Sequence, residues 1–186
     1  MIIYGGIDNG VSGGIVARFA NGEWAAHPVA VTQYNGRRVL DIHGNLAILD
    51  SLAKRAGGRD RLFVVYEQSR KNTKWGTKNS FANGQNHEFW RVLLTLEGFR
   101  FSSVDPLTWQ AACSRDLPGA DSKERALNFV RMHCPDLEWL EEFNVAKRKA
   151  IVDAMCVALW SISLKLGEET ALTGPLPGHG VGVQRH

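Results

Sequence analysis

The nine residues RLFVVYEQS, from Arg61 to Ser69, constrain the fold more than any other stretch of the chain. They form a short, almost wholly apolar run bounded by polar residues, which is typical of a strand buried on both faces. A chain of 186 residues is long enough to build one well-buried core around such a strand. We therefore expect one domain over residues 1–166. The Gly- and Pro-containing segment 167–186 has no periodicity, and we expect it to be mobile.

The remaining elements alternate in a way that defines the fold class. Three strand-like runs, at 2–8, 13–20 and 23–31, precede this strand, and a further one follows from Gly98 and ends before Pro106. Apolar residues at helical spacing, with Ser122 as a candidate N-cap, predict helices over 41–56, 81–97, 107–114, 122–133 and 146–166. The order βββαβαβα with short crossovers predicts an α/β fold, a mixed five-stranded sheet with helices on both faces.

Composition excludes several classes of protein. No apolar run reaches membrane-spanning length and no basic, apolar leader opens the chain, so we expect no membrane association and a cytoplasmic, intracellular protein. The three cysteines are widely spaced and suggest no disulfide framework, and the adjacent His133 and Cys134 lack further ligands for zinc. The net charge of +3 permits a polyanionic partner without requiring one.

Three acidic residues stand at positions where the predicted fold would bring them together. Asp8 ends the first strand and Glu67 ends the fourth, so parallel pairing of these strands places both at one edge of the sheet. Asp153 interrupts an otherwise apolar helical stretch from Ala150 to Trp160, which predicts a buried carboxylate. Such a group must be neutral, hydrogen-bonded, ion-paired or bound to a cation.

Each acid has a simpler explanation when it is taken alone. Asp8 precedes a glycine-rich turn, Glu67 could cap a strand edge, and Asp153 could pair with Lys149 four residues earlier on the same helix. Together they indicate a metal site, because clustered carboxylates repel one another and a divalent cation relieves that repulsion. Mg²⁺ suits such a site because it accepts one or two carboxylates alongside phosphate oxygens and water.

The loop directly after Glu67 has the composition of a nucleic-acid contact. SRKNTKWGTKNS, residues 69–80, contains no acid. It has four basic residues, Arg70, Lys71, Lys74 and Lys78, and one aromatic residue, Trp75. Basic side chains neutralise phosphates and an exposed Trp stacks on an unpaired base, although a solvated loop with a packed Trp would share this composition. The helix over 81–97 has a surplus of large apolar residues, which serve the core or a two-fold interface.

The chain resembles a known family over residues 3 to about 164. The segments GIDNGVSGGIV, VVYEQS, NSFANGQNHEFWRVLLTLEGFRFSSVDPLTWQ, DSKERALNFVRMHCPDL and KRKAIVDAMCVAL, in this order and spacing, resemble the RuvC-like crossover junction endonucleases, particularly phage-type members. The resemblance implies a ribonuclease H-like fold, a homodimer, and cleavage of four-way (Holliday) DNA junctions in a phage or its bacterial host. It also implies two Mg²⁺ or Mn²⁺ ions per active site.

The resemblance also assigns roles to single residues. Asp8 would bridge both ions, Glu67 and Asp153 would each hold one, and Lys123 would approach the scissile phosphate. The chemistry implied is two-metal hydrolysis, in which an activated water attacks the phosphorus and leaves a 5′ phosphate and a 3′ hydroxyl.

The chain departs from the family at one position. Many relatives carry a fourth metal ligand about one helical turn before the last acid, where this chain has Lys149 and Ala150. Three acids and water hold the second metal ion, or Lys149 plays part of the role of the missing ligand, or the protein is a weakened nuclease that binds junctions without cutting them. A nuclease for other branched or flapped DNA is a further alternative. GIDNGVSG also resembles the first phosphate motif of sugar kinases and actin-like ATPases, but the second motif and the greater length of those proteins are missing.

Overall fold

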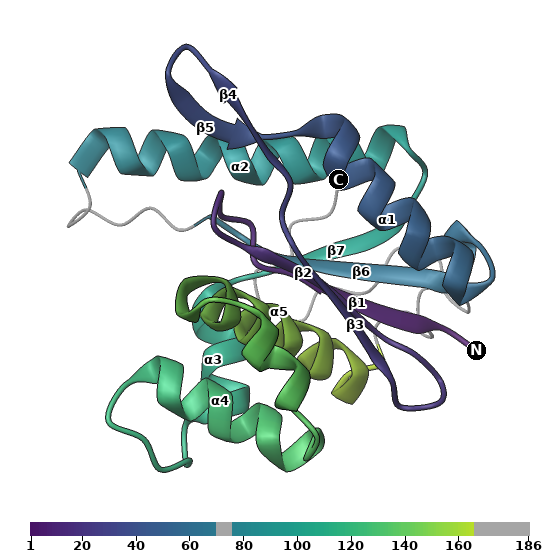
Figure 1. Cartoon of the computed structure of the whole chain (residues 1–186), viewed down its shortest axis with the longest axis vertical. Coiled ribbons are helices and arrows are strands. Elements are labelled where there is room, and N and C mark those ends of the chain that lie inside the picture. Colours follow the sequence, from purple (N-terminus) through teal and green to yellow (C-terminus); the bar gives the residue numbers. More distant parts are fainter. Residues whose placement is uncertain (70–75, 166–186) are drawn as a thin grey trace, which may run out of the picture.

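The computed structural model of the chain describes residues 1–69 and 76–165, and its centre is a five-stranded sheet in the order β3-β2-β1-β6-β7 (Figure 1). The first three strands form an antiparallel meander, and β1, β6 and β7 run parallel. Their bounds are β1 Ile3–Ile7, β2 Gly14–Arg18, β3 Trp24–Pro28, β6 Leu62–Glu67 and β7 Arg100–Val104. The predicted mixed five-stranded α/β sheet is confirmed.

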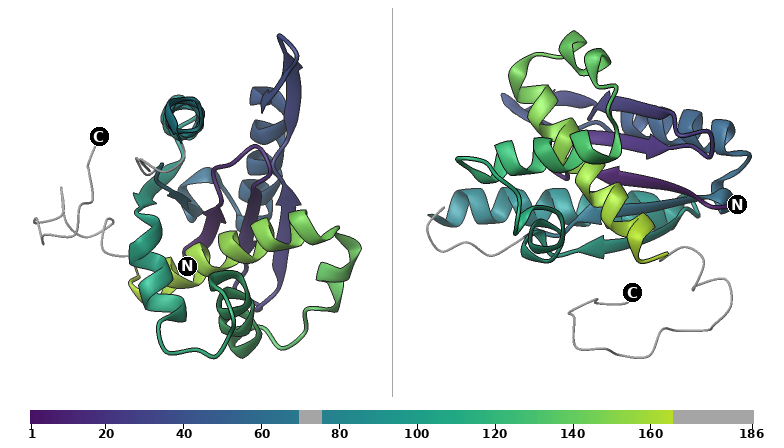
Figure 2. Two further views of the ribbon diagram at one scale, coloured as in Figure 1. Left: turned by 90° about the vertical axis from the view of Figure 1, so that its left-hand side faces the viewer. Right: turned by 90° about the horizontal axis from the view of Figure 1, so that it is seen from below.

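Helices cover both faces of this sheet (Figure 2). One face packs against α1 and α2, and the other against α3, α4 and α5, so that two separate hydrophobic clusters flank the sheet. The helices are α1 Ile42–Ala56, α2 Gly76–Leu96, α3 Pro106–Ser114, α4 Ser122–His133 and α5 Val145–Ser163, and the short 3₁₀ segments are η1 Arg59–Arg61 and η3 Glu138–Glu142.

Strand β6 shows why its sequence is so uniformly apolar. Phe63 and Val65 belong to the cluster under α5, whereas Leu62, Val64 and Tyr66 belong to the cluster under α1 and α2. Because alternate side chains of a strand point to opposite faces, a strand between two helical layers needs apolar residues throughout. The prediction of a strand buried on both faces is confirmed.

Some boundaries differ from the sequence prediction. A second hairpin, β4 Val31–Tyr34 with β5 Arg37–Leu40, occupies a region for which no elements were predicted beyond residue 31. Helix α2 begins at Gly76 rather than at residue 81. The N-cap of α4 is Asp121 rather than Ser122, because the Asp121 carboxylate accepts hydrogen bonds from the backbone N–H groups of Lys123 and Glu124.

Two further expectations concern membrane-spanning helices and the C-terminal segment. Within residues 1–69 and 76–165, no helix is long and apolar enough to cross a membrane. The segment 167–186, expected to be mobile, lies outside the described residues.

Candidate active site

The parallel pairing of β1 and β6 brings two of the predicted acids to one edge of the sheet. Ile7 lies beside Tyr66 in the register, so Asp8 and Glu67 are the next residues to leave the two strands. The loop after β1 fixes Asp8, whose backbone N–H donates to the Gly14 carbonyl at 3.0 Å. The backbone N–H of Gly10 donates to Oδ1 of Asp8 at 3.2 Å. The turn at the glycine-rich loop therefore orients a carboxylate rather than merely reversing the chain.

Glycines bring the third acid to the same edge. A Cβ atom on Gly6 would lie 2.0 Å from the Ala154 carbonyl oxygen, and one on Gly14 would lie 3.0 Å from Cα of Ile151. The backbone of α5 thus rests directly on β1 and β2, with no side chain between them. Asp153, only 5% exposed, lies in this contact region.

The three carboxylates act on one another electrostatically. Burial and the repulsion of Asp153 raise the pKa of Asp8 to about 6. Burial and the repulsion of Asp8 raise the pKa of Glu67 to about 8. Burial also raises the pKa of Asp153, against the opposing effect of Lys123. Such mutual repulsion is the property that a bound divalent cation would relieve.

Lys123 is the counter-charge of this cluster. Its Nζ atom donates to Oδ2 of Asp153 in an ion pair. Although burial lowers the pKa of Lys123, the charges of Asp153, Asp8 and Glu67 outweigh this and raise it. The ammonium group is therefore held charged beside all three acids.

Solved structures share this arrangement of elements. RuvC of T. thermophilus in complex with a Holliday junction substrate matches with a TM-score of 0.52 and 13% identity, over 88% of this chain and 96% of that chain. The chain has the ribonuclease H-like fold of RuvC. The yeast mitochondrial Holliday junction resolvase Ydc2 matches with a TM-score of 0.50 and 13% identity, over 90% of this chain and 83% of that chain. No family model and no curated protein matches the sequence, so the relationship is one of fold.

The remaining predicted site residues either lie apart from the three carboxylates or fall outside the residues that the structure describes. The ammonium partner of Asp153 is Lys123, and not Lys149 as the spacing along the helix had allowed. Lys149 is exposed, and its charge acts on Asp121 at the start of α4. Arg70, Lys71, Lys74 and Trp75 lie outside the described residues, as does the side chain of Lys78.

Two residues that the sequence did not single out hold the site in place. The indole Nε1–H of Trp109, on α3, donates to Oε2 of Glu67 at 2.9 Å, and this bond lowers the pKa of Glu67 against the effect of burial. The buried Asn9 donates from Nδ2 to the Glu67 carbonyl oxygen at 2.6 Å and to Oγ of Ser69 at 3.3 Å. Trp109 orients the carboxylate, and Asn9 ties the ends of β1 and β6 together.

The chemistry of the donor set fits a divalent cation, but the side chains are not arranged as a finished metal centre. Within the described ranges, no three His, Cys, Asp or Glu side chains are placed so that they could share a metal ion as they stand. The Asp153 carboxylate is engaged by Lys123. An ion at the three acids would therefore either share Asp153 with Lys123, which contacts only Oδ2, or displace the ammonium group.

The raised pKa values predict that the protein loses stability with rising pH when a chelator keeps it free of metal. The pKa of Glu67 is 4.5 when unperturbed and about 8 in the fold, and that of Asp8 is 3.8 and about 6. Between these values the folded state holds more protons than the unfolded state, so the free energy of unfolding falls as the pH rises, by several kcal/mol in all. Asp153 acts in the same direction.

Urea unfolding in EDTA at a series of pH values measures this slope. Glu67→Gln stays neutral at every pH, so it should remove the part of the decline that Glu67 contributes between its unperturbed pKa of 4.5 and its pKa of about 8 in the fold. Equal slopes for the variant and the wild type would contradict the prediction.

Proposed function

We propose that this chain is a structure-selective endonuclease that cuts four-way (Holliday) DNA junctions, as a homodimer of the phage or bacterial type acting in the cytoplasm. The observation that carries the proposal is the meeting of three mutually repelling carboxylates, from β1, β6 and α5, at one edge of a ribonuclease H-like sheet. A structure with the same fold has been solved on a Holliday junction substrate, which supports this choice of DNA.

The proposed site would bind Mg²⁺ or Mn²⁺ through Asp8, Glu67 and Asp153, as two ions per active site. When bound, such ions lower the pKa of an attacking water and stabilise the departing 3′ oxygen of a phosphodiester. Carboxylate oxygens are the ligands that Mg²⁺ prefers, and the raised pKa values of Asp8 and Glu67 favour neutralisation of their charge.

The chain's own residues have separate tasks in this proposal. Trp109 keeps one oxygen of Glu67 directed by its hydrogen bond, and Asn9 fixes the spacing of the two strand ends. Lys123 neutralises the cluster before the ions bind, and once it is released its ammonium can contact the scissile phosphate. Lys149 is exposed on the same helix as Asp153, where it can contact the DNA backbone.

DNA recognition is proposed to involve the segment that follows Glu67, through Arg70, Lys71, Lys74, Trp75 and, at the start of α2, Lys78. For the homodimer we propose helix α2. Trp90, Leu93 and Leu94 of α2 are buried in the core, but Phe81, Val92 and Leu96 are 67%, 43% and 78% exposed. This exposed apolar set is available for a two-fold contact.

A second candidate function is favoured by the Lys123–Asp153 ion pair and by Lys149 and Ala150 in place of a fourth acid. A protein whose own ammonium occupies one carboxylate could bind branched DNA without cutting it. Both candidates predict junction binding, and they differ in cleavage.

Incubation with an end-labelled four-way junction and with a linear duplex of the same arm sequence tests the proposal. With Mg²⁺ or Mn²⁺ we expect nicks at the junction and none in the duplex, and with EDTA no cut in either. A junction that is bound but stays uncut at every Mg²⁺ and Mn²⁺ concentration would favour the binding protein.

Trp109→Phe is expected to slow junction cleavage about 10- to 100-fold, the usual effect of losing a residue that orients a metal ligand. The change keeps an aromatic ring in the core but removes the N–H that holds Glu67. Cleavage rates across a Mg²⁺ titration should show a higher Mg²⁺ requirement.

Trp90→Phe is the matched control. Trp90 is also fully buried, and its Nε1 atom has no hydrogen-bond partner within the described part of the chain. It should lose packing without changing the Mg²⁺ requirement. If both variants shift that requirement equally, Trp109 acts through packing and not through Glu67.

A further inference from the structure

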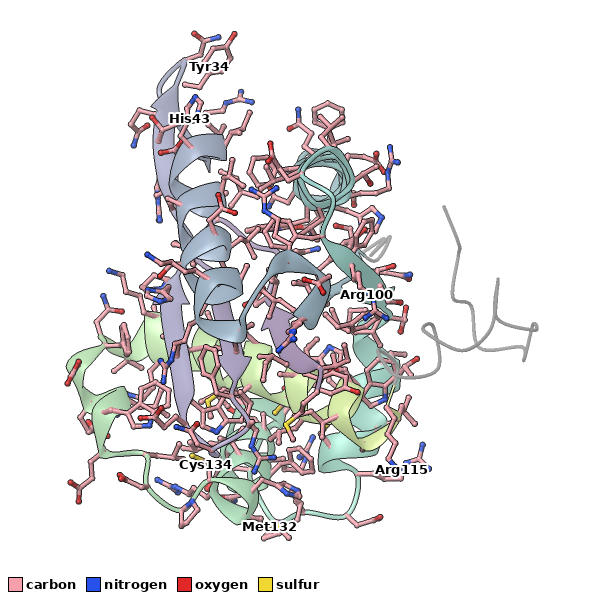
Figure 3. The ribbon with its side chains drawn as sticks, turned by 90° about the vertical axis from the view of Figure 1, so that its right-hand side faces the viewer. Tyr34, His43, Arg100, Arg115, Met132 and Cys134 are labelled. Carbon is pink, nitrogen blue, oxygen red and sulfur yellow. The ribbon has the colours of Figure 1, made fainter. Side chains whose placement is uncertain are left out.

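The hairpin β4–β5 projects from the body of the protein beside the candidate active site. Its seven residues Thr32–Arg38 are all exposed, whereas Val31 and Leu40 at its base pack into the core. Figure 3 shows Tyr34 at the far tip of the hairpin, at the opposite end of the molecule from Met132 on α4. The tip therefore contributes nothing to the core, and its exposed side chains are free to contact a partner.

The tip of the hairpin is a tight two-residue turn. Tyr34 and Arg37 form the last pair of the ladder, and Asn35 and Gly36 between them have φ values of 49° and 71°. Two successive positive φ angles are those of a type I′ turn, whose twist matches that of the flanking strands. Tyr34 and Arg37 are thus held opposite each other on one face of the hairpin.

The hairpin is also tied to the catalytic loop. The Nη2 group of Arg38 donates to the carbonyl oxygen of Val11 at 3.0 Å, in the loop that follows Asp8. Because side chains alternate along a strand, Arg37 and Tyr34 project from the face opposite to Arg38. The view onto the edge where β1 and β6 end shows the hairpin standing above that loop (Figure 2, left).

The charge of the hairpin fits a polyanion. No acidic residue occurs between Trp24 and Leu40. Within the described part of the chain, neither Arg37 nor Arg38 has a carboxylate in ion-pair contact. An exposed Tyr that is 67% accessible beside an unneutralised Arg can bind a phosphate and stack on a base or sugar.

We infer that the tip of the β4–β5 hairpin, Tyr34 and Arg37, is a second DNA contact that grips the backbone beside the phosphate to be cut. The inference rests on the proposed function for the place of the DNA. Because Arg38 ties the hairpin to the loop that follows Asp8, DNA bound at the three acids would pass close to the tip. Arg38 is the positioning residue that holds the tip there.

The test measures affinity for a fluorescent four-way junction in EDTA, at several salt concentrations, with full-length protein. Arg37→Gln should weaken binding and reduce the slope of log affinity against log salt by about 1, the loss of one phosphate contact. Tyr34→Ala should weaken binding about tenfold, the loss of one stacking contact. Arg131→Gln removes the same charge from an exposed site in the last turn of α4, and it should leave affinity and salt slope near those of the wild type.

Each result decides the inference. Weaker binding by both hairpin variants, with an unchanged circular dichroism spectrum, supports it. Wild-type affinity in both variants overturns it, as does a change in oligomeric state that accounts for the whole loss, because the hairpin is then a contact between protein chains. The same wild-type sample incubated with Mg²⁺ tests the proposed function separately. If the wild type does not nick the junction but the hairpin variants bind it more weakly, the nuclease is rejected and the DNA contact stands. If the wild type nicks the junction and the hairpin variants bind it as tightly as the wild type, the DNA contact is rejected and the nuclease stands.

Discussion

Replacing Asp8 with Asn is expected to abolish Mg²⁺-dependent cleavage of a four-way junction while leaving junction binding intact. The amide has nearly the shape of the carboxylate, but it carries no charge to hold a cation at the end of β1. We expect the cleavage rate to fall at least about a thousandfold, because electrostatic stabilisation by the metal is lost from the transition state. Single-turnover cleavage of a labelled junction gives the rate, and fluorescence anisotropy in EDTA gives the affinity.

Stability separates this effect from unfolding. Burial and Asp153 make the charge of Asp8 unfavourable in the metal-free fold, so Asp8→Asn should unfold at the same temperature as the wild type or higher above pH 6. Asp136→Asn, an exposed change in the segment after α4, is the matched control and should cut normally. An Asp8→Asn protein that still cuts at the wild-type rate would place the chemistry elsewhere, and one that no longer binds junctions would give Asp8 a role in recognition.

The sequence was sufficient to predict the sheet, because the information needed is local. The apolar run of β6 marks a strand between two layers, and the order of strands and crossovers leaves few topologies. The parallel neighbours β1 and β6 then bring Asp8 and Glu67 together as a consequence of register alone. These parts of the candidate site follow from backbone topology.

The side-chain partners could not be predicted in the same way. Helical spacing offered Lys149 for Asp153, but the partner is Lys123, thirty residues away on a different helix. In the sequence, Trp109 looks like an ordinary core residue. Only the tertiary structure shows that its Nε1–H is directed at Glu67. Pairings between helices depend on how α3, α4 and α5 pack, which no local pattern specifies.

The β4–β5 hairpin was missed for a different reason. Asn35-Gly36 is the same kind of turn dipeptide as Asn21-Gly22 between β2 and β3, but its flanking residues are mostly polar and exposed. Strand prediction relies on alternating apolar residues facing a core, and this hairpin projects away from the core. An element that projects away from the core gives a weak hydrophobic pattern.

The second large effect is expected from Gly6→Ala, which should destabilise the protein by more than about 4 kcal/mol or prevent folding altogether. A Cβ at this position would lie 2.0 Å from the carbonyl oxygen of Ala154 and 2.8 Å from the backbone nitrogen of Ala158. Both atoms belong to the backbone of α5, so no side chain can rotate away and the whole helix must move. Urea unfolding and the yield of folded protein measure the effect.

Two other glycines calibrate this prediction. Gly5→Ala would meet the Val16 carbonyl oxygen at 3.1 Å and should cost less, whereas Gly84→Ala on α2 has nothing within 4 Å and should stabilise the helix by about 0.5–1 kcal/mol. If Gly6→Ala unfolds as the wild type does, α5 does not rest on β1 as closely as described. Any folded fraction of Gly6→Ala should also lose cleavage, because a helix pushed off the sheet at Ala154 moves Asp153 away from Asp8. The contact that closes the core and the contact that assembles the carboxylates are thus the same one.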